Sequence, residues 1–238
     1  MLMKSNKKSI ITLAVSGIFA VAVMGCGNAA SNQPEENSEK SVTEVPADSI
    51  IKLLEADKTL DVSLMKALAD RASQREFADK PLSLEDLSSL LWAANGVNRE
   101  DGKRTAPSAV NAQDIDIYVC LASGAYLYEA KENQLRRITS EDLRTAVSGQ
   151  QEMTAPVFLV MVGDLSRYPE RLADKKDVVA SFAAMDAGYV SQNIGLYCAA
   201  AKLATVPRAT MDKETLAKAL NLTDSQLLLL NNPVGYMK

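Results

Sequence analysis

The stretch 181–205 constrains the fold more than any other part of the chain, because it is the longest candidate helix and lacks a broad polar face. Two sets of side chains recur in it at helical spacing. One set is apolar (Phe182, Met185, Tyr189, Leu196 and Leu203) and the other is small (Ala184, Gly188, Ser191, Gly195 and Ala199). A helix that is apolar or small nearly all round must be buried. Its small face would let another helix approach closely, so the stretch predicts a buried helix at a subunit interface.

Strand patterns lie on both sides of this helix in the sequence. Residues 115–121 alternate between apolar and other side chains, which indicates a strand with one buried face. Residues 125–129 and 134–138 flank a Lys-Glu-Asn turn and predict a hairpin. The continuously apolar run 156–163 is typical of a strand covered on both faces. A last strand is expected at 227–230.

Side chains that cap helices mark further helix starts, at Asp61, Ser83, Ser140 and Asp212. The first of these helices is expected to run to about Ala72. The second combines Ser83 and Asp86 in a capping box and should end at Gly96. The last is a short amphipathic helix that should end near Leu220.

The N-terminus has the pattern of an export signal. Three lysines (Lys4, Lys7 and Lys8) precede the apolar run 10–24, which is short for a membrane span. The run closes on Gly25-Cys26, which resembles the lipobox of bacterial lipoproteins, in which the cysteine is lipidated. The alternative is a plain signal peptide with an incidental cysteine. We therefore expect residues 1–26 to be a lipoprotein signal peptide.

Residues 27–48 are rich in Asn, Ser, Glu, Gln and Pro and show no apolar periodicity, so we expect a disordered tether. Residues 49–238 suit one domain with a substantial core. With Cys26 lipidated, the protein would be anchored to a membrane in the cell envelope, on its extracytoplasmic face, without spanning it.

Composition excludes several classes of function. The formal net charge is −4 with scattered basic residues, so no nucleic-acid partner is expected. Cys120 and Cys198 could pair in an oxidising compartment or could both be buried apolar thiols. The chain contains no histidine, which excludes Ser-His-Asp and Cys-His catalysis and histidine-rich zinc sites. We therefore expect chemistry that side chains do not perform alone.

Two polar segments are candidates for ligand contact. In Arg71-Ala-Ser73-Gln-Arg75 three donors alternate, so an extended backbone would point them the same way and form a grip for an anion. The alternative is a solvated basic helix end. The stretch Arg104–Gln113 combines small residues, a proline, hydroxyls and amides before a strand. It could admit a flat polar ligand, or it could be an ordinary loop.

Taken together, these residues resemble the FMN-dependent nitroreductase family. The resemblance covers residues 60–238 and rests on the order of four motifs. They are Arg-x-Ser-x-Arg at 71–75, Pro-Ser-Ala-x-Asn-x-Gln at 107–113, Asp-Ala-Gly-Tyr-Val-Ser-Gln-Asn at 186–193, and Pro-Val-Gly-Tyr at 233–236.

The resemblance implies an α+β fold in which helices wrap a mostly antiparallel sheet, in an interlocked homodimer with FMN at the subunit interface. It implies that Arg71, Ser73 and Arg75 hold the phosphate and ribityl chain. The partner subunit would contribute Pro107, Ser108, Ala109 and Asn111. Gln151, or Gln150 in the neighbouring register, would meet the pyrimidine edge of the flavin. Pro207, Arg208 and Ala209 would lie along the ring near N5.

Three departures from the family pattern stand out. The chain ends at Lys238, so a phosphate contact that many relatives make from a longer tail is made by Lys238 or is absent. Arg208 and Ala209 occupy positions at which many relatives have glycines, which could change access to N5. The lid insertion is short, so the chain is closest in outline to the compact, thiazoline-oxidising branch.

The resemblance implies a ping-pong oxidoreductase in which FMN passes hydride from a small-molecule donor to a nitro, quinone or similar acceptor. No protein acid or base is required, in agreement with the missing histidine. A location in the envelope separates the enzyme from cytosolic NAD(P)H, so an exported carrier, a quinol or oxidase activity are the open alternatives. A second hypothesis from another class is an inactive flavin-binding or structural lipoprotein that serves as a binding module.

Overall fold

The computed structural model describes residues 50–151 and 153–238. The expected signal peptide 1–26 with Cys26, and the expected tether 27–48, lie outside the described residues. The described part forms one sheet with helices on both of its faces. No helix within it is long and apolar enough to cross a membrane.

All strand pairs in the seven-stranded sheet are antiparallel, and the strand order is β1-β4-β3-β2-β5-β7-β6. This arrangement confirms the expected α+β class with a mostly antiparallel sheet. The strands are β1 (Ile50–Lys52), β2 (Ile115–Leu121), β3 (Gly124–Glu129), β4 (Gln134–Thr139), β5 (Val157–Asp164), β6 (Leu203–Thr205) and β7 (Gln226–Tyr236).

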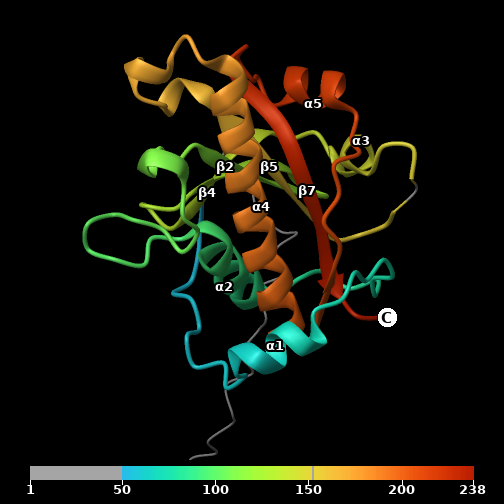
Figure 1. Cartoon of the computed structure of the whole chain (residues 1–238). Coiled ribbons are helices and arrows are strands. Elements are labelled where there is room, and N and C mark those ends of the chain that lie inside the picture. Colours follow the sequence, from blue (N-terminus) through green and yellow to red (C-terminus); the bar gives the residue numbers. More distant parts are fainter. Residues whose placement is uncertain (1–49, 152) are drawn as a thin grey trace, which may run out of the picture. The chain divides into compact units, whose positions relative to one another are not determined.

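The helices of the described residues are α1 (Leu64–Asp70), α2 (Leu84–Asn95), α3 (Arg144–Ser148), α4 (Lys176–Ala200) and α5 (Lys213–Ala219). Short 3-10 turns are η1 (Ala109–Asn111), η2 (Leu165–Arg167) and η3 (Glu170–Leu172). Figure 1 shows α4 crossing in front of the sheet, with α2 beside it and α1 near its C-terminal end.

Apolar side chains on the two faces of the sheet form two separate cores. Helices α2 and α4 cover one face, where they pack on residues such as Ile117 and Leu159. Helices α3 and α5 cover the other face, where they pack on Tyr118 and Phe158. β5 is buried on both faces, as predicted. β2 is buried on both faces as well, so the prediction of one buried face was wrong.

The two cores also separate the cysteines. Cys120, on β2, lies in the core covered by α3 and α5. Cys198, on α4 itself, lies in the other core. Both thiols are unpaired and buried. The sequence leaves open a disulfide or two buried apolar thiols, and the structure has two buried thiols.

Helix α4 begins five residues earlier than predicted and ends at Ala200 instead of Thr205. Lys202 adopts a left-handed turn (φ 61°), after which Leu203–Thr205 pairs with β7 as an edge strand. The backbone after Lys202 therefore forms strand hydrogen bonds with β7, whereas the sequence pattern predicts that the helix continues to Thr205. Periodicity does not register a pairing partner that lies far away in the sequence.

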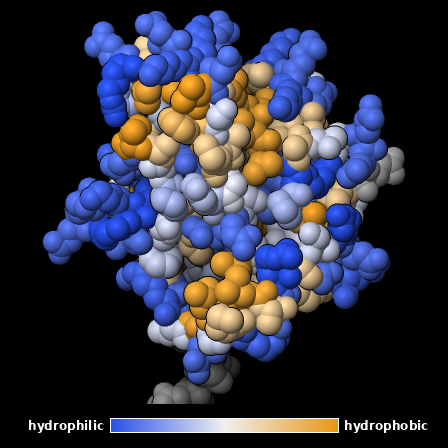
Figure 2. All heavy atoms as spheres, viewed as in Figure 1, coloured by the Kyte–Doolittle hydropathy of each residue, from blue (hydrophilic) through white to orange (hydrophobic). Residues whose placement is uncertain are grey.

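The burial of α4 is also more one-sided than predicted. Ser191 and Gly195, from the small-residue set, are buried within the chain. The outward stripe instead carries Val178, Met185 and Tyr189, which are 42%, 50% and 48% exposed. Figure 2 shows one apolar area over the N-terminal half of α4 and a second over α1.

Of the four helix starts predicted from capping side chains, two are confirmed and two are wrong. The cap of α1 is Ser63, whose Oγ accepts the Lys66 N–H at 3.2 Å, and not Asp61. The caps at Ser83 and Asp212 are confirmed. The helix expected from Ser140 begins only at Arg144.

The last strand, β7, is longer than the predicted 227–230 and continues through Pro233. The N–H of Asn231 donates to the Arg208 carbonyl at 2.7 Å. Alternate residues of a strand point the same way, so the nitrogen of Pro233 faces the same side. β6 pairs only with Val234 to Tyr236 on that side, so the proline interrupts no ladder bond there.

Candidate functional site

The Arg71–Arg75 motif leaves α1 as an extended segment along the edge strand β6. The Arg71 N–H donates to the Ala67 carbonyl at 2.9 Å and ends the helix, and the Gln74 N–H donates to the Thr205 carbonyl at 2.9 Å. The side chains that the sequence predicts as an anion grip, Arg71, Ser73 and Arg75, are all exposed. An extended segment with three exposed donors fits the grip better than a basic helix end.

The Arg71 stem packs against α4 where that helix has its smallest side chain. A Cβ atom placed on Gly195 would stand 3.7 Å from the Cγ and Cδ atoms of Arg71. In the part of the chain that the structure describes, no carboxylate forms an ion pair with Arg71 or Arg75. The two cations are therefore available to an external anion.

The segment Pro207–Ala209 follows β6 and continues along β7. Pro207 and Ala209 are exposed, whereas Arg208 is only 8% exposed. The backbone N–H of Arg208 donates to the Asn231 carbonyl at 2.8 Å, and the reciprocal bond is 2.7 Å long. The backbone and the two flanking side chains can therefore border a ligand, while the Arg208 side chain points inward.

The guanidinium group of Arg208 binds the end of α3. It donates to the carbonyls of Ser148 at 2.7 Å and Val147 at 3.4 Å, and to Asn231 Oδ1 at 3.3 Å. These carbonyls belong to the last turn of α3, where helix carbonyls lack partners. Burial lowers the pKa of Arg208, but a guanidinium stays charged at any physiological pH. The side chain is thus a structural tie between α3 and β7.

Gln150 and Gln151 lie in the turn that follows α3, and both are exposed. Gly149 opens this turn with φ 63°, and a Cβ atom placed on it would stand 3.5 Å from the Cα of Met211. The Ser148 Oγ accepts the Met153 N–H at 2.9 Å and donates to the Gln151 carbonyl. The turn is therefore held beside the segment that follows Ala209.

The three segments are connected by contacts within one chain. Segment 71–75 touches β6 through Gln74, β6 leads directly into 207–209, and the Arg208 side chain reaches the turn before 150–151. The structure therefore brings these three predicted groups of residues to one end of the sheet.

The Pro107–Gln113 motif forms a turn with an unusual backbone. Val110, Asn111 and Gln113 have φ values of 51°, 55° and 48°, a region that non-glycine residues adopt rarely and at an energetic cost. The Ser108 Oγ accepts the Gln113 N–H at 2.9 Å, and the Ser108 carbonyl accepts the Asn111 N–H at 3.0 Å. Pro107 and Asn111 are exposed.

This turn is fixed to α4 at a different place from Arg71. The N–H of Ala109 donates to Asp186 Oδ2 at 2.8 Å. Asp186 lies nine residues before Gly195, which corresponds to about 13.5 Å along the helix. One chain therefore holds the Pro107–Asn111 segment and the Arg71–Arg75 segment at separate positions along α4.

A buried pair of carboxyl groups supports the turn, and the sequence analysis did not find it. Asp114 is fully buried, and neither of its oxygens has a hydrogen-bond partner among the described residues. Asp186 is 2% exposed and also accepts the Tyr168 hydroxyl at 3.4 Å. Burial, with a further contribution from neighbouring Asp186, raises the pKa of Asp114 to about 7. The available signal was the charged Asp186 inside an otherwise apolar helix.

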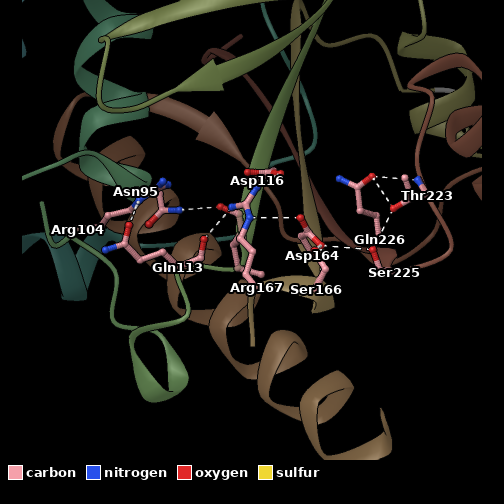
Figure 3. Close-up of polar contacts among 11 residues, drawn as sticks. Asn95, Arg104, Gln113, Asp116, Asp164, Ser166, Arg167, Thr223, Ser225 and Gln226 are labelled. Atoms are coloured by element: carbon pink, nitrogen blue, oxygen red, sulfur yellow. Dashed lines mark hydrogen bonds and ion pairs between the residues drawn. The ribbon is translucent and has the colours of Figure 1, made fainter. Parts of the chain in front are cut away.

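A second polar network lies next to the turn and was also missed. Arg167 from η2 donates to Asp116 Oδ2 at 2.6 Å and to the Gln113 carbonyl at 2.9 Å, and it lies 3.3 Å from Asp164. Figure 3 shows Arg167 between the two aspartates, with Arg104 bonded to Gln113 at its side. The contacts of Arg167 with Asp116 and Gln113 join residues more than fifty positions apart, so no local pattern indicates them.

Two cavities border these segments. A cavity of about 770 Å³ lies between the segment 77–82, the residues around α3, and Lys238. Lys238 lines this cavity, whereas Arg71, Ser73 and Arg75 do not. A polar hollow of about 550 Å³ adjoins the Pro107–Gln113 turn, and Arg104, Asn111 and Gln113 are among its lining residues.

The sequence pattern of the nitroreductase family matches residues 68–236, a range that contains all four motifs. The chain belongs to the nitroreductase family. Among solved structures, a protein of Ralstonia eutropha JMP134 that is provisionally described as a nitroreductase is 35% identical, with a TM-score of 0.75. That match covers 83% of this chain and 94% of the other. The α+β architecture described above is thus the nitroreductase fold.

Two further similar proteins share less sequence identity with this chain. A Methanocaldococcus jannaschii protein, provisionally named a nitroreductase, is 29% identical over 186 residues, which are 74% of this chain and 91% of that protein. A chain of the Escherichia coli microcin synthetase complex is 19% identical with a TM-score of 0.59, over 79% of this chain and 78% of that one. The latter shares the nitroreductase fold.

Proposed function

We propose that this nitroreductase-family protein is an FMN-dependent oxidoreductase that works as a homodimer. The observation that carries the proposal is the row of exposed donors, Arg71, Ser73 and Arg75, on an extended segment next to Pro207–Ala209. A doubly charged phosphate needs such unpaired donors, because arginine forks and a hydroxyl match its oxygen geometry.

The residues present fit the cofactor in its two chemically different parts. The cationic segment would hold the phosphate and ribityl chain. The exposed turn with Gln150 and Gln151 would supply amide groups to the polar edge of the flavin ring. Pro207 and Ala209 present small side chains and exposed backbone, which suits close approach of a flat ring. Arg208 contributes indirectly, by fixing these two segments to each other.

When bound, FMN would supply reversible hydride transfer at its N5 atom in a ping-pong exchange between a donor and a small nitro, quinone or similar acceptor. The chain's own part is binding and orientation. No histidine is present to move protons, and the buried Asp114 and Asp186 are closed off from solvent, so they are unsuited to direct contact with a substrate.

Two features of the chain support a homodimer with shared sites. The Pro107–Asn111 segment is held about 13.5 Å along α4 from the Arg71–Arg75 segment. A partner related by two-fold symmetry could place its own copy of the first segment against the second. The outward stripe of α4, with Met185 and Tyr189 about half exposed, is an apolar surface suited to such an interface.

The test is flavin binding by the full chain purified in mild detergent, followed by absorbance after gel filtration. Wild type should retain the flavin bands. Arg71→Ala and Arg75→Ala should each weaken FMN affinity by roughly tenfold or more, since a hydrogen bond to a charged group contributes about 1.5–3 kcal/mol.

The matched control is Arg136→Ala, which removes an exposed arginine on β4 and should leave flavin binding unchanged. Reduction of the bound flavin by a donor and its reoxidation by an acceptor would then support turnover. A colourless protein that ignores added FMN would reject the oxidoreductase and favour the binding-module hypothesis.

A further inference from the structure

The polar hollow beside the Pro107–Gln113 turn contains an arginine whose side chain is only partly used. Arg104 donates from Nε to Gln113 Oε1 at 3.2 Å. In the residues that the structure describes, no carboxylate forms an ion pair with its guanidinium. The two terminal nitrogens, which make the flat fork of the group, are therefore open to a ligand.

Arg104 is held firmly in place. Its backbone pairs with Val97 in an isolated antiparallel bridge, and its carbonyl accepts from Arg99 Nη2 at 3.1 Å. The Gln113 amide is itself oriented, because its Nε2 donates to the Gly102 carbonyl at 3.2 Å. A cation fixed in this way loses little side-chain entropy when a ligand binds.

Two of the carboxylates that line the hollow are already engaged by other arginines. Asp116 pairs with Arg167 at 2.6 Å, and Glu129 pairs with Arg136 at 2.6 Å. Lys131 and Glu132 are adjacent, exposed and of opposite charge. Arg104 and Arg167 are the two arginines that line the hollow, and Arg104 is the one that forms no ion pair within the described ranges 50–151 and 153–238, because nearby Asp116 is already paired with Arg167.

Burial strengthens the demand for an anion at this point. It lowers the pKa of Arg104, while nearby Asp116 acts in the opposite direction. The guanidinium remains charged, but it is partly shielded from water, and electrostatic attraction is stronger where water is excluded. Leu127, Ala112 and Ala130 add apolar surface to the same wall.

We propose that the hollow of about 550 Å³ is a substrate subsite in which Arg104 receives the carboxylate of a small organic acid. One forked guanidinium that carries a single charge matches one carboxylate in charge and in geometry. A phosphate would bring about two charges to this one unpaired guanidinium.

The proposal rests on the proposed function, because Asn111 and Ala112 line the hollow and belong to the turn that would reach the partner's flavin. A carboxylate held by Arg104 would place the rest of an acceptor or donor next to that flavin. The subsite would therefore select acidic substrates from the wider class that the family fold can accept.

The test compares two ligands of nearly the same shape, the anion 4-nitrobenzoate and the neutral 4-nitrobenzamide. Each is titrated by calorimetry into the full-length, oxidised protein, without any reductant. Wild type should bind the carboxylate roughly tenfold more tightly than the amide, which corresponds to about 1.4 kcal/mol. Arg104→Gln should reduce this preference to less than about twofold, and Arg104→Lys should keep part of it, because lysine retains the charge without the fork.

Lys103→Gln is the matched control. It removes the same charge one position away, from an exposed lysine that pairs with Asp101 and does not line the hollow. The preference for the carboxylate should survive in this variant. Absence of a preference in wild type, its survival in Arg104→Gln, or an equal loss in Lys103→Gln would overturn the proposal.

Two further readouts separate the possible causes. Inorganic phosphate should compete more weakly than 4-nitrobenzoate, and equal competition would overturn the assignment to a carboxylate. Flavin absorbance is recorded on each protein. If wild type lacks flavin, the proposed function fails, and the ligand titration still decides whether Arg104 binds carboxylates. If Arg104→Gln keeps its flavin and loses the preference, both proposals stand.

Discussion

At the scale of single residues, the buried carboxyl pair has the clearest physical consequence. Asp114 and Asp186 lie where water cannot compensate a charge, and the cations nearby are already engaged by other partners. One carboxylate accepts the Ala109 N–H, which fixes the turn that we assign to the partner's flavin. A proton kept by Asp114 lets the two groups coexist, since two buried like charges repel each other strongly.

This proton should make stability depend on pH. Burial and Asp186 raise the pKa of Asp114 from 3.8 to about 7 in the folded chain. Between these values the folded chain keeps a proton that the unfolded chain has lost. The free energy of unfolding therefore falls as pH rises from about 4 to about 7, by at most about 1.4 kcal/mol per pH unit from this group, and is level above that range.

Asp114→Asn should remove this dependence, because an amide does not ionise and brings no second charge next to Asp186. Relative to wild type, the variant should gain stability as the pH rises from about 4 to about 7 in urea unfolding experiments. The control is Asp174→Asn, which alters an exposed carboxylate. Parallel curves for wild type and Asp114→Asn would contradict the assignment.

Residue types in the motifs could be predicted from the sequence, but the direction of each side chain could not. Arg71, Ser73 and Arg75 are exposed in an extended segment, but so are the residues between them, so their predicted alternation stays a prediction. Arg208 belongs to an equally polar segment, yet its side chain turns inward to carbonyls about sixty positions away. No local pattern contains these acceptors, so only the folded chain decides which arginine is exposed and which is buried.

At the scale of elements, α4 organises both parts of the candidate site. It contacts the Pro107–Asn111 turn through Asp186 and the Arg71 stem through Gly195. Its inner face packs on the sheet, and a hydrogen bond from Ser191 to Asn232 at 2.7 Å ties it to β7. Its outer face retains apolar side chains that the described chain leaves uncovered.

We expect this outer stripe to mediate the dimer. Met185→Glu and Tyr189→Glu should each shift the protein from dimer to monomer in analytical ultracentrifugation, because a carboxylate in an apolar interface loses its hydration. The same variants should lose flavin, since each proposed site needs both subunits.

The control for the interface is Ile50→Glu. This residue is 49% exposed on β1, the edge strand opposite to β6, so its replacement should leave the dimer and its flavin intact. A wild type that sediments as a monomer would contradict the homodimer. Dimeric variants with unchanged flavin would move the interface away from α4.

At the scale of the whole molecule, the predicted membrane attachment rests on a part of the chain outside the described residues. We expect lipidation of Cys26, because the lysines, the apolar run and Gly25-Cys26 follow the order of a lipoprotein signal. Labelled palmitate fed to producing bacteria should enter the wild type and not Cys26→Ser.

Cys120→Ala is the control for this labelling, since Cys120 is buried and its loss should not affect the label. An unlabelled wild type that is cleaved and released would indicate a plain signal peptide. With a lipid anchor, the electron donor would have to be available in the envelope.

The sequence by itself determined the class of fold, the order of the motifs and most strand positions. Apolar runs, capping residues and turn residues act over a few positions, so they predict helices and strands without knowledge of the rest of the chain. The runs at 115–121 and 156–163 became β2 and β5, and Ser83 capped α2 as predicted. The four motifs also indicated the family correctly.

Tertiary structure decided what depends on distant partners. Thr205 belongs to β6 and not to the predicted helix, because the backbone there pairs with β7. β2 is buried on both faces because α3 and α5 cover its second side. The carboxyl pair and the fixed fork of Arg104 likewise arise from contacts across the fold. A side chain's burial and charge environment depend on what packs against it, and that is set by the whole fold.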